Sequence, residues 1–427
     1  MSERDQSLGL VATLRSMPRG LYVIGLATLI SRSGGFLAIF GSIYLTSISI
    51  TYDQAVAVLS AAGICGMAGS LLSGRLADRF TPKSVLIVAS LINSMALGVL
   101  ASRPGTGVSA AIVVVASTMT QAFVPPAAAS VEAFAPDAAS RTPFFAFFRL
   151  FLNLGSALSP MLAAVLGETR FDRLFVYSAG ANLAASALLA TMFRTTGARG
   201  QKNASETTAP VDRANPTGVW PGVAVLAALA VVASVYAQYQ STLPLEIRAT
   251  HGQLRLYSVL LVVNSGLVIL GELPLSLVTR RFPIRTSLTA GVTIMTIGLT
   301  VSGAFAGSVV ALVLGAVLFT AGEMVFAPVA NTAAASLAPA GRAATYQGYL
   351  SSGQALGFAL GPAAGVALYF RTDSAAWVVF GLTGLACALV LAGVVRTGPP
   401  LPEAANATPK PEAELDRPSD SEGLQCD

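Results

Sequence analysis

The sequence has few of the residues on which most catalytic and metal centres are built. It contains one histidine, His251, and three cysteines, Cys65, Cys387 and Cys426, in 427 residues. One histidine argues against a histidine-based metal cluster or a catalytic triad, and these cysteines give no disulfide framework. No Gly-Lys dipeptide occurs, so the phosphate-binding loop of an ATP-driven motor is absent. We therefore expect no enzymatic activity, no metal and no cofactor.

Charge is scarce as well. Charged residues make up 11% of the chain and hydrophobic residues 54%, with a mean hydropathy of +0.68, whereas a typical soluble protein is about 25% charged. A core this apolar could not be covered by polar surface in water, but lipid solvates apolar surface. The net charge of +5 is spread over short connectors and forms no stripe that would suit nucleic acid. The composition predicts a membrane protein.

The hydrophobic residues fall into twelve runs, each close to the roughly 20 residues that cross a bilayer core of about 30 Å. The runs are Leu21–Leu45, Val56–Leu76, Val85–Ala101, Val108–Ala129, Phe144–Leu166, Leu174–Met192, Val219–Leu243, Leu256–Val278, Ser287–Ala304, Val309–Ala330, Tyr346–Tyr369 and Ala376–Val395. We therefore predict a six-helix bundle over 1–193, a cytoplasmic linker over 194–218, a second bundle over 219–396 and a disordered cytoplasmic tail over 397–427.

The distribution of Lys and Arg predicts the orientation. If both termini are cytoplasmic, 18 of the 26 basic residues lie inside, six lie outside and two lie within spans. This excess on one side follows the positive-inside rule. The segment Met1–Arg19 leads into the first run without a cleavage site, so we expect an uncleaved, multi-pass protein of a cell membrane.

The two halves of the chain are related by an internal repeat. A shift of 202 residues, without gaps, places Arg79 on Arg281, Pro126 on Pro328 and Pro160 on Pro362, and it also aligns two glycine pairs. Backbone geometry restricts the placement of Gly and Pro more than that of other residues. Because each half has six spans, the halves share one orientation and are related by an axis along the membrane normal.

The connector after the second span carries a family motif. It reads Gly74-Arg-Leu-Ala-Asp78-Arg79-Phe-Thr-Pro-Lys83 and resembles the loop signature of the major facilitator superfamily, Gly-x-x-x-Asp-Arg/Lys-x-Gly-x-Arg/Lys, with Thr81 in place of the second Gly. The resemblance covers nearly all of the apolar part of the chain. It implies an all-α fold in which two pseudo-symmetric six-helix bundles flank a central cavity.

These loop residues have a physical role of their own. Gly74 permits close approach of a neighbouring helix, and Asp78 can cap a helix or pair with a base to form a latch. We assign Gly74, Asp78, Arg79 and Lys83 to gating. The alternative is that the charges only enforce the topology.

The eleventh span carries a second motif, Gly357-x-x-x-Gly361-Pro362. It resembles the Gly-x-x-x-Gly-Pro signature that exporters of this superfamily carry in the fifth span, where this chain has Ser159 before Pro160. The resemblance implies a proton-coupled efflux branch for drugs or metabolites. The two glycines and Pro362 could form a gate, or they could serve ordinary helix packing.

Two arginines lie within predicted spans. Arg32 is about 16 Å of helix from either interface, where an isolated arginine costs about 2.5–3.5 kcal/mol even on lenient scales. It should therefore face a wet cavity, together with Phe36, or pair with an acid. Arg149 lies nearer the cytoplasmic end, where it could gate the cavity or reach the interface, and Asn153 is one turn deeper.

Two carboxylates lie at depth, Glu272 in the eighth span and Glu323 in the tenth. Burial favours a protonated carboxyl and a neighbouring arginine favours an ionised one, so such a group can exchange a proton. We predict that one of the two carries a coupling proton. The alternative is a permanent pair with Arg32 or Arg149. Further polar side chains in the spans are predicted to line the substrate cavity: Gln121, Tyr236, Gln238, Asn264 and Gln354.

These features favour a monomeric exporter of small organic molecules that works by alternating access in exchange for protons, with the bilayer as its surroundings. An uptake symporter or facilitator for a sugar, amino acid or organic anion is the second candidate. A membrane sensor or scaffold without transport is the third, and charged residues at depth argue against it.

Overall fold

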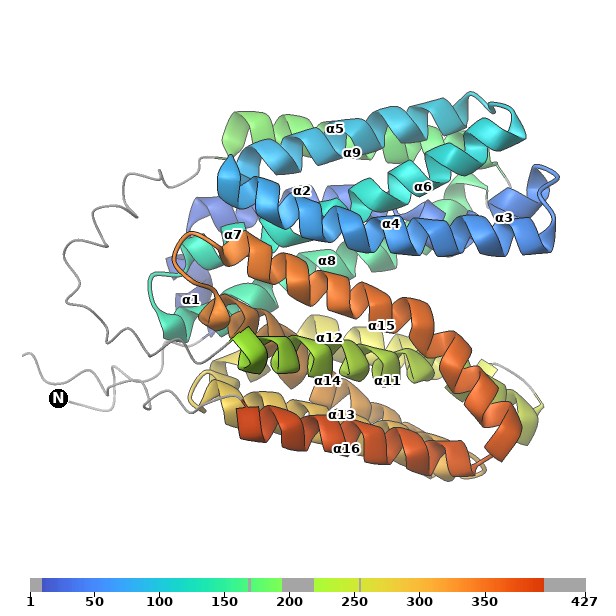
Figure 1. Ribbon diagram of the computed structural model, residues 1–427, viewed down its shortest axis with the longest axis vertical. Coiled ribbons are helices and arrows are strands. Elements are labelled where there is room, and N and C mark those ends of the chain that lie inside the picture. Colours follow the sequence, from blue (N-terminus) through green and yellow to red (C-terminus); the bar gives the residue numbers. More distant parts are fainter. Residues whose placement is uncertain (1–9, 168–169, 194–218, 253–254, 395–427) are drawn as a thin grey trace, which may run out of the picture.

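Helices form all of the regular structure in the computed structural model, which describes residues 10–167, 170–193, 219–252 and 255–394, and no strand occurs in these ranges (Figure 1). The helices are α1 (Leu10–Ser16), α2 (Arg19–Ser33), α3 (Phe36–Ser47), α4 (Tyr52–Arg79), α5 (Pro82–Ala101), α6 (Thr106–Ala122), α7 (Val124–Phe134), α8 (Ala138–Leu166), α9 (Phe171–Met192), α11 (Val219–His251), α12 (Arg255–Thr279), α13 (Ile284–Ala304), α14 (Val309–Leu337), α15 (Ala343–Thr372) and α16 (Ala375–Val394). The predicted linker 194–218 and tail 397–427 lie outside the described residues.

The helices agree with the predicted spans. Within the described ranges, eleven helical segments are long and apolar enough to cross a membrane, and α6 with α7 forms one of them. The first predicted span, Leu21–Leu45, is divided between α2 and α3. The predicted all-α membrane fold with twelve spans is therefore confirmed, although its first span is not one continuous helix.

The break in the first span lies at Gly34 and Gly35. A Cβ at Gly34 would lie only 2.9 Å from the Cα of Ser178 on α9. The hydroxyl of Ser178 donates to the Gly34 carbonyl oxygen over 2.7 Å, which satisfies a carbonyl at the end of α2. Two adjacent glycines are poor helix formers, so here the chain exchanges helical hydrogen bonds for a close contact with α9.

A second break separates α6 from α7 at Phe123 in the fourth span. Pro125 and Pro126 follow, and neither can donate a backbone hydrogen bond to the preceding turn. The equivalent helix of the second half, α14, has only Pro328 and remains continuous.

Each half has its own apolar core. The helices α2 to α9 form one bundle and α11 to α16 the other, one above the other in Figure 1. Phe144, Phe145, Phe147 and Phe148 of α8 are buried in the first bundle. Phe319 of α14 and Trp377 of α16 are fully buried in the second. Large apolar side chains are also exposed on the outside of both bundles, as lipid contact requires.

The predicted repeat is visible in the helix packing. Gly155 of α8 faces α2, where an added Cβ would lie 2.7 Å from the Leu29 carbonyl oxygen and 2.9 Å from the Cβ of Arg32. Gly357, its repeat equivalent, faces α11, where an added Cβ would lie 2.9 Å from the backbone nitrogen of Ser234. Arg32 and Ser234 are themselves 202 residues apart. The same glycine contact therefore builds both halves.

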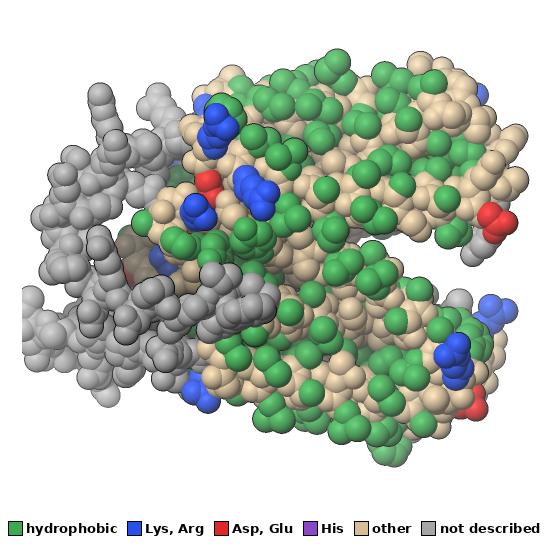
Figure 2. Space-filling view, in the orientation of Figure 1, with side chains coloured by type: hydrophobic (Ala, Val, Ile, Leu, Met, Phe, Trp, Pro, Cys, Tyr) green, Lys and Arg blue, Asp and Glu red, His purple; other side chains and the backbone are tan. Residues whose placement is uncertain are grey.

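The two bundles meet at one end of the molecule, the end at which α1 begins and α16 finishes (Figure 1). There α15 packs against α4, and α8 packs against α12 and α14. Figure 2 shows the bundles parting at the opposite end, so that a cleft opens between them. The cleft therefore lies at the end that the distribution of Lys and Arg predicts to be extracellular.

The glycine contact between α11 and α15 is a test of the packing. Gly357→Val should lower the stability by roughly 1–3 kcal/mol, because the new side chain would meet the Ala230 carbonyl oxygen and force the helices apart. The midpoint of thermal unfolding in detergent measures this. Gly266→Val on α12 is the matched control, since nothing lies within 4 Å of a Cβ there. Equal losses in the two variants would contradict the packing argument.

Candidate functional site

Three charged side chains from both halves meet between the bundles, and we call Arg149, Glu272 and Glu323 the ion cluster. The Nε of Arg149 on α8 donates to Oε1 of Glu272 on α12 over 2.5 Å. Its Nη2 lies 3.6 Å from Oε1 of Glu323 on α14. The side chains of the two glutamates are 2% and 10% exposed, and that of Arg149 is 19% exposed. One guanidinium of the first half thus joins two carboxylates of the second.

Polar neighbours hold Glu323 on its other sides. The hydroxyl of Tyr236 on α11 donates to Glu323 Oε1 over 3.0 Å. The Nδ2 of Asn264 on α12 donates to Glu323 Oε2 over 3.1 Å and to the Thr320 hydroxyl over 2.9 Å. Both carboxylate oxygens of Glu323 therefore have donors, as a buried ion requires. Asn264, predicted to line the substrate cavity, is thus a hydrogen-bond partner of Glu323 in this structure.

Two polar atoms of the same region have no partner. Oε2 of Glu272 and Nδ2 of Asn153 are buried without a hydrogen bond. Buried polar atoms of this kind are costly unless a water, a proton or a ligand satisfies them. Glu272 is thus held by Arg149 through one oxygen only, and its second oxygen is available to a proton.

The cluster combines one positive charge with two negative ones when all three groups are ionised. A single proton on either glutamate makes it neutral. Removing an uncompensated charge from a low-dielectric interior is strongly favourable. The arrangement can therefore bind and release one proton, and the release of Glu272 from Arg149 would weaken the contact between the bundles.

A second contact between the halves lies at the closed end. Asp78, at the end of α4, accepts hydrogen bonds from the backbone nitrogens of Ala344 (3.0 Å) and Thr345 (2.8 Å) in the first turn of α15. A carboxylate at a helix N-terminus satisfies free N–H groups and the positive end of the helix dipole. Gly74 allows this approach, because its Cβ would lie 2.5 Å from the Ala344 carbonyl oxygen. We call this contact the Asp78 latch.

The other basic residues of the loop motif lie elsewhere. Lys83 donates to the carbonyl oxygens of Ala190 (3.0 Å) and Phe193 (2.6 Å), so it caps α9 within its own half. Arg79 is exposed and lies 5.8 Å from the ring of Phe80. Neither side chain has a hydrogen bond or ion pair to a described residue of the second half. Their predicted gating role stays a prediction.

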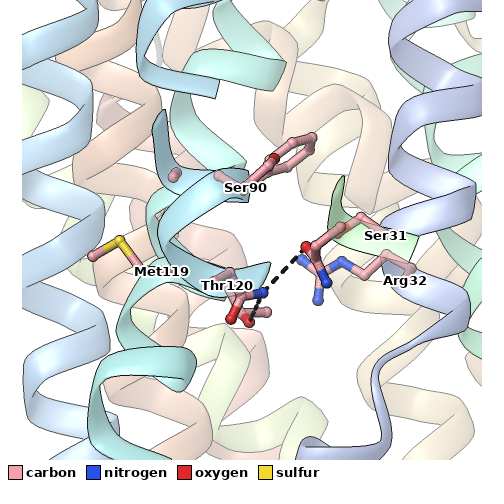
Figure 3. Close-up of a pocket in the computed structure, with 9 residues that line it drawn as sticks. Ser31, Arg32, Ser90, Met119 and Thr120 are labelled. Atoms are coloured by element: carbon pink, nitrogen blue, oxygen red, sulfur yellow. Dashed lines mark hydrogen bonds between the residues drawn. The ribbon is translucent and has the colours of Figure 1, made fainter. Parts of the chain in front are cut away.

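Arg32, in the last turn of α2, lies apart from the ion cluster and lines a small pocket inside the first bundle (Figure 3). Among the described residues it forms no ion pair. In this structure the arginine that pairs with the glutamates is Arg149 and not Arg32. Phe36, predicted to share its face, begins α3 after the break, is 1% exposed and packs on Tyr177.

The remaining predicted cavity residues differ in their surroundings. Gln238 is buried, and its Nε2 donates to the carbonyl oxygens of Ser234 and Gly361, each over 2.8 Å, so it links α11 to α15. Gln121 and Gln354 are half-buried. Gly361 packs against Ser234, and Pro362 lies inside α15. Gln238 and the two glycines of the second motif thus serve packing within one half in this state.

Sequence reasoning missed the polar side chains around Arg32, chiefly Asn93, Thr120 and Asn182. They come from α5, α6 and α9, and only the folded bundle brings them together. The internal repeat offers a signal that could have found them. The equivalent positions of the second half hold Met295, Gly322 and Gly384, which have no such polar side chains, so the polar residues are specific to the first half. No group of three metal-ligating side chains occurs in the described ranges.

Comparison with known proteins agrees with this architecture. A family model described as Major Facilitator Superfamily matches residues 21–263 and again 225–421. No curated protein matches the sequence. Solved structures with the same fold include the human organic anion transporter MFSD10 (TETRAN), with a TM-score of 0.66 and 16% identity over 87% of this chain and 99% of that one.

Two sugar transporters are similar as well. The proton:xylose symporter XylE, bound to 6-bromo-6-deoxy-D-glucose, has a TM-score of 0.70 and 12% identity over 88% of this chain and 95% of that one. The E. coli fucose:proton symporter FucP has a TM-score of 0.67 and 13% identity over 88% and 98%. These likenesses concern the fold.

The ion cluster generates a stability prediction. Arg149→Gln should destabilise the protein by about 3–5 kcal/mol, because it leaves buried carboxylates without a counter-charge. Replacing Glu272 and Glu323 by Gln as well should restore most of the loss. Thermal unfolding in detergent measures both. Arg103→Gln, at an exposed pair with Asp172, should change the midpoint little. A triple variant no more stable than Arg149→Gln alone would contradict this account.

The Asp78 latch generates a conformational prediction. Asp78→Ala removes two hydrogen bonds to a charged acceptor, each of about 1.5–3 kcal/mol, and should shift the population toward states open at the latch end. Thr142 is buried against Thr332 across the interface, with 3.2 Å between the hydroxyls. Maleimide labelling of Thr142→Cys, with the native cysteines replaced by serine, should therefore become several-fold faster.

A matched control separates this effect from a general loss of stability. Asp137 caps α8 within its own half by accepting a hydrogen bond from the Ser140 nitrogen over 2.7 Å. Asp137→Ala should leave the labelling rate of Thr142→Cys unchanged. If both alanine variants accelerate labelling equally, Asp78 is not a latch.

Proposed function

The chain belongs to the Major Facilitator Superfamily, and from this membership and the ion cluster we propose that it exports small organic molecules in exchange for protons, without covalent chemistry on the solute. The observation that carries the proposal is the contact of Arg149 with Glu272 and Glu323 across the two halves. Because this contact links the two halves, protonation of one of its glutamates changes how strongly the bundles are held together.

The proposed cycle follows from the state of the cluster. In the described conformation the cleft opens at the end opposite the latch (Figure 2), and the cluster holds the halves together on the latch side. A proton that arrives through the cleft neutralises one glutamate and weakens its attraction to Arg149. The two bundles then rock against each other, and the proton leaves on the latch side. The solute is carried outward when the bundles return to the described conformation.

The solute site lies beside the cluster in this proposal. Asn153, with its unpaired Nδ2, and the half-buried Tyr236 and Asn264 supply hydrogen-bonding groups. Gln121 and Gln354 are the further lining residues of the proposed substrate cavity. Organic solutes and proton coupling both occur on this fold, since the similar structures include an organic anion transporter and two proton symporters. Export rather than uptake rests on the exporter-like motif at Gly357, Gly361 and Pro362.

The setting is part of the proposal. We propose a monomer in a cell membrane with both termini cytoplasmic, and this orientation fits the excess of Lys and Arg on the latch side. The described chain begins and finishes at that same end (Figure 1), as an even number of spans requires.

Everted membrane vesicles test the function. With the lumen made acidic, vesicles that contain the protein should accumulate one or more members of a panel of fluorescent organic cations and anions. Replacing both Glu272 and Glu323 by Gln should abolish accumulation driven by the gradient, while exchange of labelled for unlabelled solute continues. Of the two single variants, the one that removes the coupling carboxylate should do the same. The reason is that a glutamine cannot release a proton.

The control and the contrary outcomes are defined by the structure. Glu246→Gln changes a carboxylate that accepts from Trp377 Nε1 within the second half (3.0 Å), so it should keep the coupling. Driven accumulation that persists in the double variant at 272 and 323 would remove the proton role of the cluster. Accumulation only in right-side-out vesicles placed in acidic medium would replace export by uptake symport.

A further inference from the structure

The pocket around Arg32 lies inside the first bundle, away from the interface of the two halves. Six side chains that can form hydrogen bonds line it, from four different helices: Ser31, Arg32, Ser90, Asn93, Thr120 and Asn182. Figure 3 shows the Arg32 side chain extending from α2 toward the space beside Thr120. The cavity has a volume of about 10 Å³, enough for one atom of the size of a water oxygen.

The hydrogen bonds of the pocket leave atoms without partners. Nδ2 of Asn93 donates to Oδ1 of Asn182 (3.2 Å) and to the Thr120 hydroxyl (3.4 Å), and Ser31 also donates to Asn182 Oδ1 (2.9 Å). Oγ of Ser90 and Oδ1 of Asn93 are buried and unpartnered. The pocket therefore offers a free hydroxyl donor beside a guanidinium.

The guanidinium itself has no counter-charge among the described residues. It forms no ion pair with any described carboxylate, while the other arginine at depth, Arg149, is held by two. The carbonyl end of α2 supplies a partial negative charge of roughly half a unit. A cation in a membrane interior requires more than that. An anion is the ligand that this environment lacks.

The fold does not require these polar groups. The second half repeats the same helices, and at the six equivalent positions it holds Ala233, Ser234, Val292, Met295, Gly322 and Gly384. Val292 and Met295 are fully buried in its apolar core. A bundle of this architecture can thus be built with an apolar interior at the same place, so the fold alone does not account for the polar set in the first half.

We propose that the Arg32 pocket binds one monovalent anionic group, which accepts from the Arg32 guanidinium and the Ser90 hydroxyl. Among monovalent anions, a chloride ion and a single carboxylate oxygen are the closest in size to this cavity, whereas sulfonate and phosphate groups are larger. A carboxylate in the pocket would belong to the transported solute, which would then be a carboxylic acid; this case rests on the proposed function. Binding of the anion itself does not depend on transport.

The test measures binding by the full chain in detergent, without transport. The thermal midpoint is followed in equal concentrations of sodium chloride, sodium acetate and sodium isethionate, whose sulfonate group is larger than chloride or a carboxylate. Chloride, acetate or both should raise the midpoint by a few degrees in a saturable manner relative to isethionate. A response to chloride alone identifies an inorganic ion, and a response to acetate identifies a carboxylate.

Two variants connect the response to the pocket. Arg32→Gln should abolish it. Asn93→Asp places a carboxylate beside the guanidinium, so it should raise the midpoint in isethionate and remove the response to the other salts; this variant keeps the test valid if Arg32→Gln does not fold. Arg371→Gln, at the exposed end of α15, should respond as the unaltered protein does.

Two results would overturn the proposal. One is the same midpoint in all three salts for the unaltered protein, which would mean that only water fills the cavity. The other is an undiminished response to chloride or acetate in Asn93→Asp. Because no gradient or solute movement is involved, either result leaves the proposed function standing. A failed vesicle experiment equally leaves the anion site standing.

Discussion

The rest of the structure depends on one buried interaction, the guanidinium of Arg149 held between the carboxylates of Glu272 and Glu323. The three charges come from α8, α12 and α14, so the two bundles can part at the closed end, where the Asp78 latch lies, only if the interaction is broken. Breaking it while all three groups are ionised would leave bare charges in an apolar interior. A proton on one glutamate lowers that cost, and for this reason the contact can act as a coupling device as well as a support.

The Asp78 latch supports the same closed end by different physics. It joins a carboxylate to the N-terminus of α15 through two backbone hydrogen bonds. The charge of Asp78 meets a helix dipole near the membrane surface, where water competes and the energy is smaller. The cluster and the latch together hold one end shut, and nothing comparable joins the described residues at the opposite end, where the cleft opens.

The two halves share a backbone plan but divide the polar chemistry between them. The second half carries the two carboxylates, and the first half carries both arginines at depth, Arg32 and Arg149. When all four are ionised these charges sum to zero. An added proton or an added anion each disturbs that balance by one unit, in opposite directions. The two proposals therefore assign a site for positive charge and a site for negative charge to one scaffold whose repeated halves have diverged.

The sequence by itself determined the membrane class, the twelve spans and the repeat, and it singled out Arg149, Glu272, Glu323 and Asp78, which the structure places in contacts between the halves. These follow from hydropathy, from Gly and Pro placement, and from the rule that charge in lipid needs a reason. Only the tertiary structure decided which charges meet, that Asn264 donates to Glu323, and that Gln238 and Gly361 contact each other between α11 and α15. It also divided the first span at Gly34 and gathered Asn93, Thr120 and Asn182 around Arg32. Helical periodicity places a side chain on a face of its own helix, whereas its partner is set by the rotation and depth of neighbouring helices, which no single segment encodes.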